Sequence, residues 1–395
     1  MSELEHVGVT GTNGKTSTTR FVAAALGALA RPVPSITTIG AFIDDERFGT
    51  ALTQGGMFEA LRAALERGAR YAALEVTSEV LARGFARTWP FRAAVFTNLT
   101  HDHLDAHGSA EHYFASKAQL FHALPVANGI AVVNGCDEVS DLLLEVTPPG
   151  VRRLTYGVAS RGAAKVALTA CAGPVDVTLR GTSAEVALAP ELGGGSVRLV
   201  TRAIGEIFLE NALGACVVAL ALGAPRADVL ERIAALPTPT GRFEVIAENP
   251  VVVIDYAHTP DALERTVATA RRITQNGRVT LVFGAGGRRD RDKRPAMGAA
   301  VARADRVILT SDNPRDEDPA DIAAAIRAGM PASFSVVVEL DRERAIRRAV
   351  LEAGAADVVV IAGKGHELTQ TTGGVTREFS DHDVARRVAG ERGAR

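Results

Sequence analysis

A glycine-rich segment near the N-terminus, GVTGTNGKTST from Gly8 to Thr18, places a lysine and several hydroxyl residues between an apolar run and a helical pattern. Backbone N–H groups in such a loop can surround phosphate oxygens, Lys15 can reach the β and γ phosphates, and the Thr16 hydroxyl can bind Mg²⁺. The strict phosphate-loop pattern needs glycine where Val9 stands, so this is a variant form. The segment predicts ATP binding; the structural alternative is a glycine-rich turn with a solvated lysine. The predicted nucleotide-binding residues are Gly11, Thr12, Asn13, Gly14, Lys15, Thr16 and Ser17.

Three more residues in the first half of the chain can serve phosphate chemistry. Glu75 ends the apolar run YAALE and His103 lies in THDHLD, where a carboxylate and an imidazole at strand ends can ligate a metal ion. Lys117, in YFASKAQLF, is either desolvated or extends to solvent. Taken singly, a solvated acid, a structural histidine and a surface lysine are the simpler interpretations, and Asp102 and Asp105 are expected to cap or orient.

The second half contains an arginine between two prolines, in SDNPRDEDP from Ser311 to Pro319. Pro314 would hold Arg315 on a short rigid loop at a strand end, where a guanidinium can bind a carboxylate through two hydrogen bonds. The neighbouring acids would balance this charge or cap the helix that Pro319 begins. The simpler interpretation is an exposed loop arginine.

The elements that must position these residues follow an α/β pattern. Apolar runs at residues 7–10, 71–76, 93–98 and 129–134 alternate with helical segments, which predicts a mostly parallel sheet covered on both faces. Between about residues 151 and 200, alternating β-branched residues and glycine turns predict a small antiparallel addition. Helices are predicted at 211–222 and 226–236, before a linker at 237–243.

The alternation then restarts, with apolar runs beginning at Val251, Arg278, Arg306, Phe334 and Ala356. Five strands with intervening helices predict a second, Rossmann-like domain. Ligands of such sheets bind at the carboxyl ends of the strands, and the polar residues above lie at these ends.

Composition sets the broad class. The chain has 395 residues and a net charge of -2, which predicts more than one domain and a small-molecule partner, with no nucleic acid and no anionic membrane. Three widely spaced cysteines indicate neither a disulfide framework nor a zinc site. The N-terminal residues lack a signal-peptide pattern and no apolar run is long enough to span a bilayer, so a cytoplasmic location is expected.

Several segments in this order resemble the Mur ligase superfamily, and most closely its MurE type, which adds the third amino acid of the peptidoglycan stem. They are GVTGTNGKTST, EVTS, FTNLTHDHLDAHGSAEHYFASKAQLF, VIDYAHTPDALE, GAGGRRDRDKRPAMG, DNPRDEDP and AGKGHE, and they cover nearly the whole chain. The resemblance implies a central ATP-binding domain at 1–239 and a C-terminal amino-acid-binding domain at 240–395. It also implies an ADP-forming ligase that activates a carboxylate as an acyl phosphate and joins it to an amino acid.

The resemblance assigns roles to individual residues. Thr16 would serve one Mg²⁺, Glu75 and His103 a second, and Lys117 would be carbamylated and support the metal, so that Lys15, Glu75, His103 and Lys117 are the predicted catalytic set. Asn211 and Arg242 match positions near adenine and phosphate, and Asp255 and His258, at a strand end, are predicted to contact the nucleotide. The amino acid, predicted to be diaminopimelate or a similar one, would be bound by Arg289, Asp312, Asn313, Arg315, Gly363 and Glu367.

The acceptor side departs from the MurE pattern. The MurE type has a nucleotide-binding domain before its phosphate loop, whereas the phosphate loop of this sequence begins at Gly8. The T-T-P stretch of the family is LTQGG in this sequence, where Gln54 and Gly55 replace threonine and proline. The S-S-H stretch of the family is Thr77-Ser78-Glu79. Phe208 stands three residues before Asn211, at a position where the family usually has an asparagine, and this change affects the expected adenine contact.

These departures predict an acceptor other than the usual uridine-diphosphate muramoyl dipeptide. Two alternatives stay open. One is a true peptidoglycan MurE enzyme, shortened or completed by an accessory chain; the other is a phosphate-loop nucleotide-binding protein without ligase activity.

Overall fold

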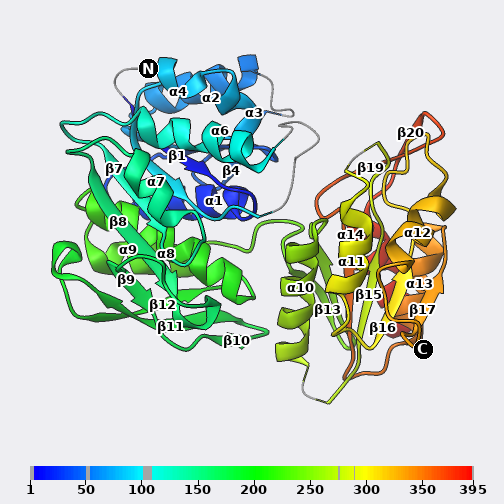
Figure 1. The fold of residues 1–395 in the computed structure, drawn as a ribbon. Helices are drawn as coiled ribbons and strands as arrows, with labels where there is room; N and C mark the ends of the chain where they lie inside the picture. The colour runs from blue at the N-terminus through cyan, green and yellow to red at the C-terminus, as the bar shows by residue number, and fades with distance from the viewer. Residues whose placement is uncertain (1–3, 50–53, 101–108, 275, 289, 394–395) are drawn as a thin grey trace. The chain divides into compact units, whose positions relative to one another are not determined.

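The computed structural model describes residues 4–49, 54–100, 109–274, 276–288 and 290–393. The chain divides into two compact units. The N-terminal unit comprises Met1–Asp176, Gly181–Arg202 and Glu206–Pro237, and the C-terminal unit comprises Thr238–Arg395 with the short segments Val177–Arg180 and Ala203–Gly205. Figure 1 shows the elements of both units along the chain.

The N-terminal unit is built on a twelve-stranded sheet in the order β10-β11-β9-β8-β7-β6-β1-β5-β2-β3-β4, with β12 paired to β11. All neighbours from β9 to β2 run parallel, whereas β2–β3–β4 and β9–β11–β12 pair antiparallel. The strands are β1 (Glu5–Thr10), β2 (Pro34–Thr37), β3 (Gly40–Ile43), β4 (Glu46–Phe48), β5 (Tyr71–Glu75), β6 (Phe91–Phe96), β7 (Ile130–Asn134), β8 (Arg152–Val158), β9 (Ala170–Ala172), β10 (Asp176–Thr178), β11 (Gly181–Leu188) and β12 (Ser196–Thr201).

Helices cover both faces of this sheet (Figure 1). They are α1 (Lys15–Leu26), α2 (Gln54–Glu66), α3 (Ser78–Ala82), α4 (Phe85–Thr88), α6 (Ala110–His122), α7 (Ser140–Val146), α8 (Glu206–Ala221) and α9 (Arg226–Ala235), with 3₁₀ turns at Ala159–Arg161 and Pro190–Leu192. Helices α2, α3, α4, α6 and α7 share one apolar core with one face of the sheet, and α1 and α8 pack on the other. Because both faces are covered, neighbouring residues such as Ala73 and Leu74 of β5 are both buried.

The C-terminal unit has a six-stranded sheet in the order β13-β14-β18-β15-β16-β17, parallel except for the antiparallel edge strand β13. Its strands are β13 (Glu244–Glu248), β14 (Val251–Asp255), β15 (Val279–Phe283), β16 (Arg306–Leu309), β17 (Val336–Val338) and β18 (Val358–Ala362). Its helices are α10 (Pro260–Ile273), α11 (Lys293–Ala300), α12 (Pro319–Arg327), α13 (Arg342–Glu352) and α14 (Asp381–Gly393). Helices α13 and α14 share a buried core with Val252, Ile254 and Ile361 of the sheet.

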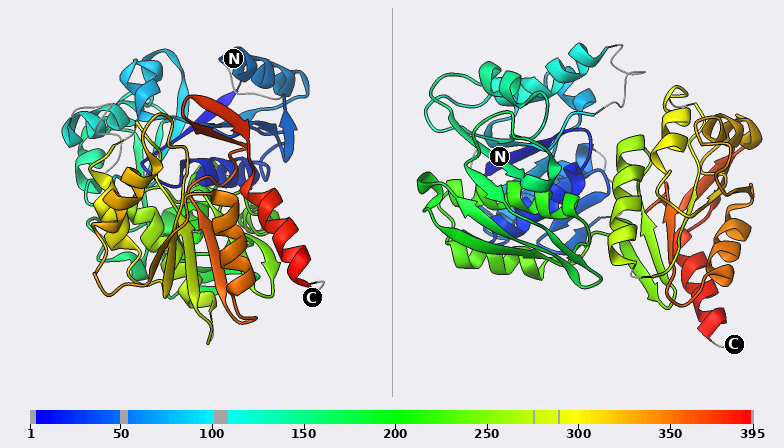
Figure 2. Two further views of the ribbon diagram at one scale, coloured as in Figure 1. Left: turned by 90° about the vertical axis from the view of Figure 1, so that its right-hand side faces the viewer. Right: turned by 60° about the horizontal axis from the view of Figure 1, so that its bottom comes forward.

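A separate hairpin, β19 (Thr369–Thr372) and β20 (Val375–Glu378), follows β18 and lies at the end of this sheet where the parallel strands finish (Figures 1 and 2). It turns through Gly373 and Gly374, which both have positive φ angles. The backbone of Arg315, in the loop after β16, forms an isolated parallel bridge with Thr372. The hairpin is therefore joined to the loop that contains the DNPR residues.

The predicted fold class is confirmed: both units are α/β with mostly parallel sheets, and the antiparallel strands after β8 extend the first sheet. Several elements were not anticipated, namely β2–β4, β13 and the hairpin β19–β20. Most of these strands are of mixed polarity, and β3, with the sequence GAFI, is only four residues long, so none has the longer apolar run that reveals a central strand. Helix α8 begins at Glu206, five residues before the predicted start at Asn211.

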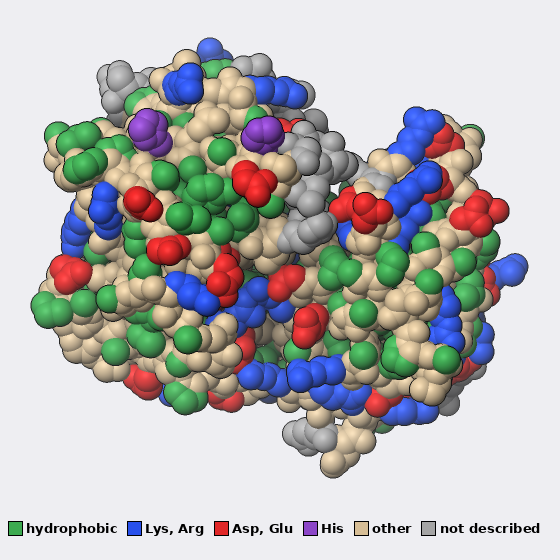
Figure 3. Space-filling model, in the orientation of Figure 1, with side chains coloured by type: hydrophobic (Ala, Val, Ile, Leu, Met, Phe, Trp, Pro, Cys, Tyr) green, Lys and Arg blue, Asp and Glu red, His purple; other side chains and the backbone are tan. Residues whose placement is uncertain are grey.

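Within the described ranges, no helix is long and apolar enough to cross a membrane. On the face shown in Figure 3, acidic and basic side chains are interspersed over both units, as expected for a net charge of -2.

Candidate active-site regions of the two units

The phosphate loop lies between β1 and α1, as predicted. Helix α1 begins at Lys15 after Gly14 in a left-handed conformation (φ 84°), with no side-chain cap and no acidic residue in its first turn. The helix dipole favours an anion at this helix start. The Lys15 ammonium donates hydrogen bonds to the carbonyls of Gly11 (3.1 Å) and Thr12 (2.8 Å), so it lies folded over the loop.

Two glycines of the loop are required by close contacts. A Cβ at Gly11 would lie 1.9 Å from Thr97 Oγ1, and a Cβ at Gly14 would lie 2.5 Å from Asn211 Oδ1. Both positions also have positive φ angles, which L side chains rarely adopt. The loop therefore packs directly against Thr97, after β6, and against Asn211 of α8.

The segment after β6 holds the loop in shape. Asn98 Oδ1 accepts a hydrogen bond from the Asn13 N–H (2.9 Å), and the Thr97 hydroxyl donates to the Asn13 carbonyl (2.7 Å). The hydroxyl of Thr12 accepts from the backbone N–H of Thr100 (3.0 Å). These bonds connect the phosphate loop to the segment after β6.

Asn211 is 1% exposed, and its Nδ2 has no hydrogen-bond partner among the described residues. An unsatisfied buried amide costs free energy, about 1–3 kcal/mol. A polar ligand beside the loop would satisfy it, so Asn211 fits the predicted role in binding the adenine nucleotide.

An oxygen-rich cluster lies beside the loop, at the end of β5. Glu75 Oε2 accepts hydrogen bonds from Thr16 Oγ1 (2.9 Å) and from the backbone N–H of Thr38 (3.0 Å), and the Thr38 hydroxyl lies 3.3 Å from both carboxylate oxygens. Two hydroxyls and a carboxylate are the hard ligands that Mg²⁺ prefers. The described residues therefore fit a Mg²⁺ held by Thr16 and Glu75.

His103, Asp102 and Asp105 lie outside the described residues, so the predicted second metal ligand is not placed. Among the residues that are placed, no group of three or more His, Cys, Asp or Glu side chains is arranged to hold a metal ion. The second Mg²⁺ site stays a prediction.

Lys117 on α6 is buried, with 1% exposure, so it does not extend to solvent. Its ammonium donates a hydrogen bond to the Gly11 carbonyl (2.8 Å) and lies 4.1 Å from the centroid of the Tyr113 ring. Both contacts suit a cation. The lysine reaches the phosphate loop as predicted, while its carbamylation stays a prediction.

In the C-terminal unit, the predicted nucleotide contacts gather at the end of β14. The Arg242 guanidinium lies 4.4 Å from the Tyr256 ring centroid, and the His258 ring packs against the same tyrosine, 4.6 Å between centroids. Asp255 is buried, and its oxygens accept hydrogen bonds from the Tyr256 N–H and the Thr266 hydroxyl, 2.6 Å each. Asp255 therefore shapes this strand end, and its contact with a nucleotide stays a prediction.

The loop after β16 carries the DNPR residues. Arg315 has a φ of 56°, a conformation that costs a non-glycine residue about 1–2 kcal/mol. Its N–H donates to the Thr371 carbonyl (3.0 Å), and its guanidinium donates to the Gly287 carbonyl. Asn313 Oδ1 accepts from the Thr371 N–H (3.0 Å). The β19 strand thus fixes both residues, and strain of this kind is typical of functional loops.

The acids that follow Arg315 do not pair with it. Glu317 accepts hydrogen bonds from Arg294 (3.1 and 3.2 Å) and Arg291 lies within 3.1 Å; these contacts, Arg294 above all, lower its pKa to about 2. Asp316 pairs with Arg288. Asp318 caps α12 by accepting from the Ala320 N–H (2.8 Å). The alternative in which these acids balance Arg315 is wrong, while the helix-capping alternative is confirmed for Asp318.

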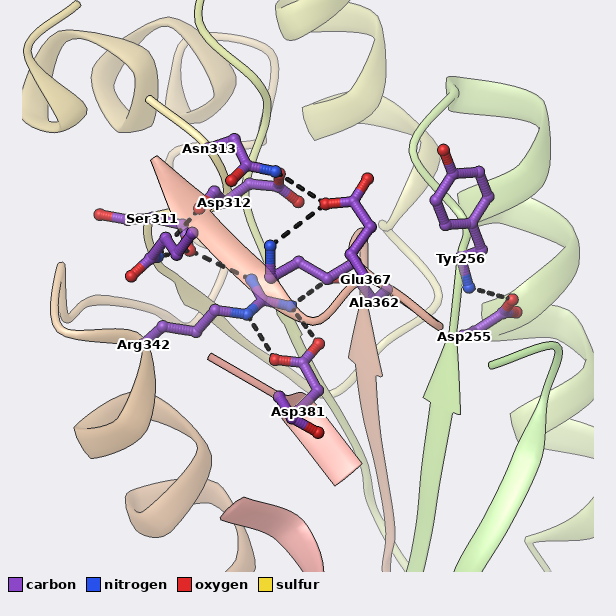
Figure 4. A network of polar contacts seen from close by, with 12 residues as sticks. Asp255, Tyr256, Ser311, Asp312, Asn313, Arg342, Ala362, Glu367 and Asp381 are labelled. Carbon is purple, nitrogen blue, oxygen red and sulfur yellow. Dashed lines mark hydrogen bonds and ion pairs between the residues drawn. The ribbon is translucent and has the colours of Figure 1, made fainter. Parts of the chain in front are cut away.

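The loop after β18 faces the DNPR loop (Figure 4). Glu367 Oε2 accepts hydrogen bonds from Asn313 Nδ2 (2.8 Å) and from the buried Lys364 ammonium (3.2 Å). Gly363 has a φ of 111°, and a Cβ there would lie 2.5 Å from Asp312 Oδ2. Burial raises the pKa of Asp312, while Arg342 and Lys364 lower it. The structure thus brings together Asp312, Asn313, Gly363 and Glu367; Arg289 lies outside the described residues.

Sequence reasoning missed some residues of these regions. Thr38 has no distinctive neighbours in the sequence, and Lys364 was passed over although it lies inside the AGKGHE segment. Arg342 and Asp381 lie among other charged residues at helix starts, and their burial, 2% and 0% exposed, is what distinguishes them.

The sequence and the fold match known proteins. Residues 9–219 match the Mur ligase middle domain, and residues 241–365 match the Mur ligase glutamate ligase domain. The UDP-N-acetylmuramoyl-L-alanyl-D-glutamate–2,6-diaminopimelate ligase of Synechococcus elongatus is 42% identical, over 98% of this chain and 77% of that protein. The ligase of the same name from Thermosynechococcus vestitus is 38% identical over the same shares.

A solved structure of a ligase with that name is 33% identical to the chain, with a TM-score of 0.68, and the match covers 99% of this chain and 79% of the other. On the match of both domains and on these identities, the chain belongs to the Mur ligase family of ATP-dependent, ADP-forming ligases.

Proposed function

We propose that this ligase joins diaminopimelate to the carboxylate of a UDP-N-acetylmuramoyl dipeptide, as the names of its relatives describe for them. The observation that carries the amine half of the proposal is the pairing of the DNPR loop with the loop after β18, through Asn313 and Glu367. A guanidinium, an amide and a carboxylate suit an amino acid with a second carboxylate.

The proposed reaction begins with transfer of the γ phosphate of ATP to the acceptor carboxylate, which gives an acyl phosphate and ADP. The amine then attacks the acyl carbon, phosphate leaves with the C–O bonding electrons, and the nitrogen loses a proton, which forms the amide. Negative charge develops in both steps, so stabilising cations are needed near the phosphate. Mg²⁺, when bound, would neutralise part of the charge on the phosphate oxygens.

The residues of the N-terminal unit support the first step. The N–H groups at the start of α1 would bind phosphate oxygens, and Lys15 would leave the Gly11 and Thr12 carbonyls for the phosphates. Glu75 and Thr16 would orient the metal, and Lys117, which reaches the loop at the Gly11 carbonyl, would support the metal in a carbamylated form.

Arg315 is proposed to bind the distal carboxylate of the amino acid. Its guanidinium contacts the Gly287 carbonyl, a neutral acceptor that a carboxylate would outcompete. Replacing Arg315 with Ala should raise the KM for the amino acid much more than the KM for ATP, and an equal rise in both would contradict this role.

A second candidate keeps the amine and changes the acceptor. Glu79, exposed in the first turn of α3, stands where the MurE pattern has a histidine, and a carboxylate there would repel an anionic acceptor. A first-turn acid also stabilises its own helix, which is a structural reason for the same residue. The relatives' names favour the usual acceptor.

The test is an assay of ADP release with Mg²⁺, diaminopimelate and either the UDP-muramoyl dipeptide or other γ-carboxylate acceptors, with the product identified by mass spectrometry. Product from the nucleotide acceptor is the expected result. Product only from another carboxylate would favour the second candidate. ADP release without any acceptor or amine would contradict both.

A further inference from the structure

A fully buried ion pair lies behind the amine-binding loops. Arg342 begins α13 and Asp381 begins α14, and both side chains have 0% exposure. The guanidinium donates from Nε to Asp381 Oδ1 and from Nη2 to Oδ2, at 2.7 Å each (Figure 4). Burying two charges costs several kcal/mol per ion, so an apolar pair could stabilise these helices as well. Stability alone is a weak reason for such a pair.

The same guanidinium also contacts two strand ends. Nη1 donates to the Ser311 carbonyl (3.2 Å) and Nη2 to the Ala362 carbonyl (3.0 Å). Ser311 lies just after β16, whereas Ala362 ends β18, and these strands are separated by β15 in the sheet. Arg342 therefore connects two strand ends that have no backbone pairing with each other.

Each of these carbonyls immediately precedes a residue of the candidate amine site. Asp312 follows Ser311, and Gly363 follows Ala362. The two residues are in close contact, because a Cβ on Gly363 would lie 2.5 Å from Asp312 Oδ2. A small shift of either strand end would therefore change the spacing between the DNPR loop and the loop after β18.

We propose that the Arg342–Asp381 pair is a positioning element for amino-acid binding, which sets the separation of Asp312 and Asn313 from Gly363 and Glu367. Arg342 acts through the two carbonyls, and Asp381 orients the guanidinium that reaches them. The inference rests on the proposed function, since it assumes that these loops bind the amine. It assigns no role in ATP binding to either residue.

The test compares KM values for diaminopimelate and ATP in Arg342→Lys, Asp381→Asn and the double variant Arg342→Met with Asp381→Leu. Lysine keeps the charge but cannot reach four acceptors at once. The apolar pair should still fold, with a lower Tm, because it removes both buried charges together but leaves the Ser311 and Ala362 carbonyls without the guanidinium. In each folded variant the KM for diaminopimelate should rise about tenfold or more, equivalent to about 1.4 kcal/mol, while that for ATP stays within about twofold.

Arg306→Lys is the matched control, because Arg306 lies at the other end of β16 and pairs with Glu352 (2.7 Å). It should leave both KM values unchanged. An apolar pair that folds and keeps the wild-type KM for diaminopimelate would overturn the proposal, as would equal rises for both substrates. Loss of folding in all three variants would show a stability element and would also overturn it.

Arg315→Ala separates this inference from the proposed function. If that variant raises the KM for diaminopimelate and the Arg342 and Asp381 variants do not, the positioning role is wrong and the function stands. If Arg315→Ala leaves that KM unchanged, the assigned amine site is wrong.

Discussion

At the scale of single residues, Glu75 shows how one carboxylate can organise a phosphate site. It accepts hydrogen bonds from Thr16 and from Thr38, which come from α1 and from the residue after β2. Two separate segments thus converge on one acid at the end of β5. The hydroxyl of Thr16 and the carboxylate of Glu75 are oxygen ligands suited to Mg²⁺.

Replacing Glu75 with Gln should weaken Mg²⁺ binding. The amide keeps the size and a hydrogen-bond acceptor but removes the charge that attracts Mg²⁺, so the Mg²⁺ concentration for half-maximal ADP release should rise at least about tenfold. Glu66→Gln, at an exposed acid on α2, is the control and should leave that concentration unchanged. An unaltered Mg²⁺ dependence in the Glu75 variant would remove this residue from the metal site.

Replacing Gly363 with Ala should affect both stability and amine binding. The positive φ should cost about 1–2 kcal/mol of unfolding free energy, and the new Cβ should displace Asp312. Gly374→Ala is a matched control, because Gly374 has a φ of 76° with nothing within 4 Å of its Cβ position.

Urea unfolding should show a loss in both glycine variants, whereas only Gly363→Ala should raise the KM for diaminopimelate. Similar KM values in the two variants would mean that the contact of Gly363 with Asp312 has no part in amine binding.

The residues of the candidate sites could be predicted from the sequence, whereas the contacts of their side chains could not. The GKT triplet and the DNPR stretch carry their own local geometry, a loop before a helix and a proline-held turn. By contrast, Glu317 pairs with Arg294 and not with Arg315 two residues before it, since Arg315 has a left-handed backbone and its side chain contacts Gly287. Such a conformation is not encoded by residue type.

At the scale of elements, helix α12 illustrates a capped start that the sequence does predict. Pro319 occupies its first turn, and Asp318 accepts a hydrogen bond from the Ala320 N–H (2.8 Å). Replacing Asp318 with Ala should therefore cost about 1 kcal/mol of unfolding free energy.

Urea denaturation measures the cost of this cap. Asp321→Asn, which removes a first-turn charge without removing a cap, should cost only a few tenths of a kcal/mol. The KM for diaminopimelate should not change in either variant, since the Asp318 side chain caps its own helix. A cost no larger for Asp318→Ala than for Asp321→Asn would contradict the capping role.

Strands were predicted where burial on both faces leaves a continuous apolar run. The central strands β14, β15 and β18 are of this kind, with Val253, Leu281 and Val360 all at 0% exposure. The hairpin β19–β20 carries mostly threonine, glycine and charged residues, and Val375 in it is 67% exposed. Its stability comes from contacts with Asp312, Asn313 and Arg315, which lie more than fifty residues earlier in the chain.

At the scale of the whole molecule, the stability should depend on pH through His6. This residue of β1 is completely buried, and burial lowers its pKa from 6.5 to about 4. Between these pH values the unfolded chain binds the proton more readily than the folded one. The unfolding free energy should therefore fall as the pH drops from about 6.5 to 4, by about 3 kcal/mol from this residue.

Denaturant unfolding of wild type and His6→Gln at several pH values isolates this contribution. The stability difference between the two proteins should change by about 3 kcal/mol across this range, and a constant difference would contradict the assignment. Asp137 provides an opposite case, because burial raises its pKa to about 6 and so favours the folded protein at low pH. Asp137→Asn should consequently lose stability faster on acidification than the wild type.

The sequence alone determined the α/β class, the phosphate loop and the DNPR loop, because these depend on residues within one short segment: apolar runs, glycines and a proline. Only the tertiary structure decided that Arg342 meets Ser311, Ala362 and Asp381, or that Thr38 reaches Glu75. Those contacts join residues 20 to 39 positions apart in the chain. They follow from strand order and helix packing, which no local pattern encodes.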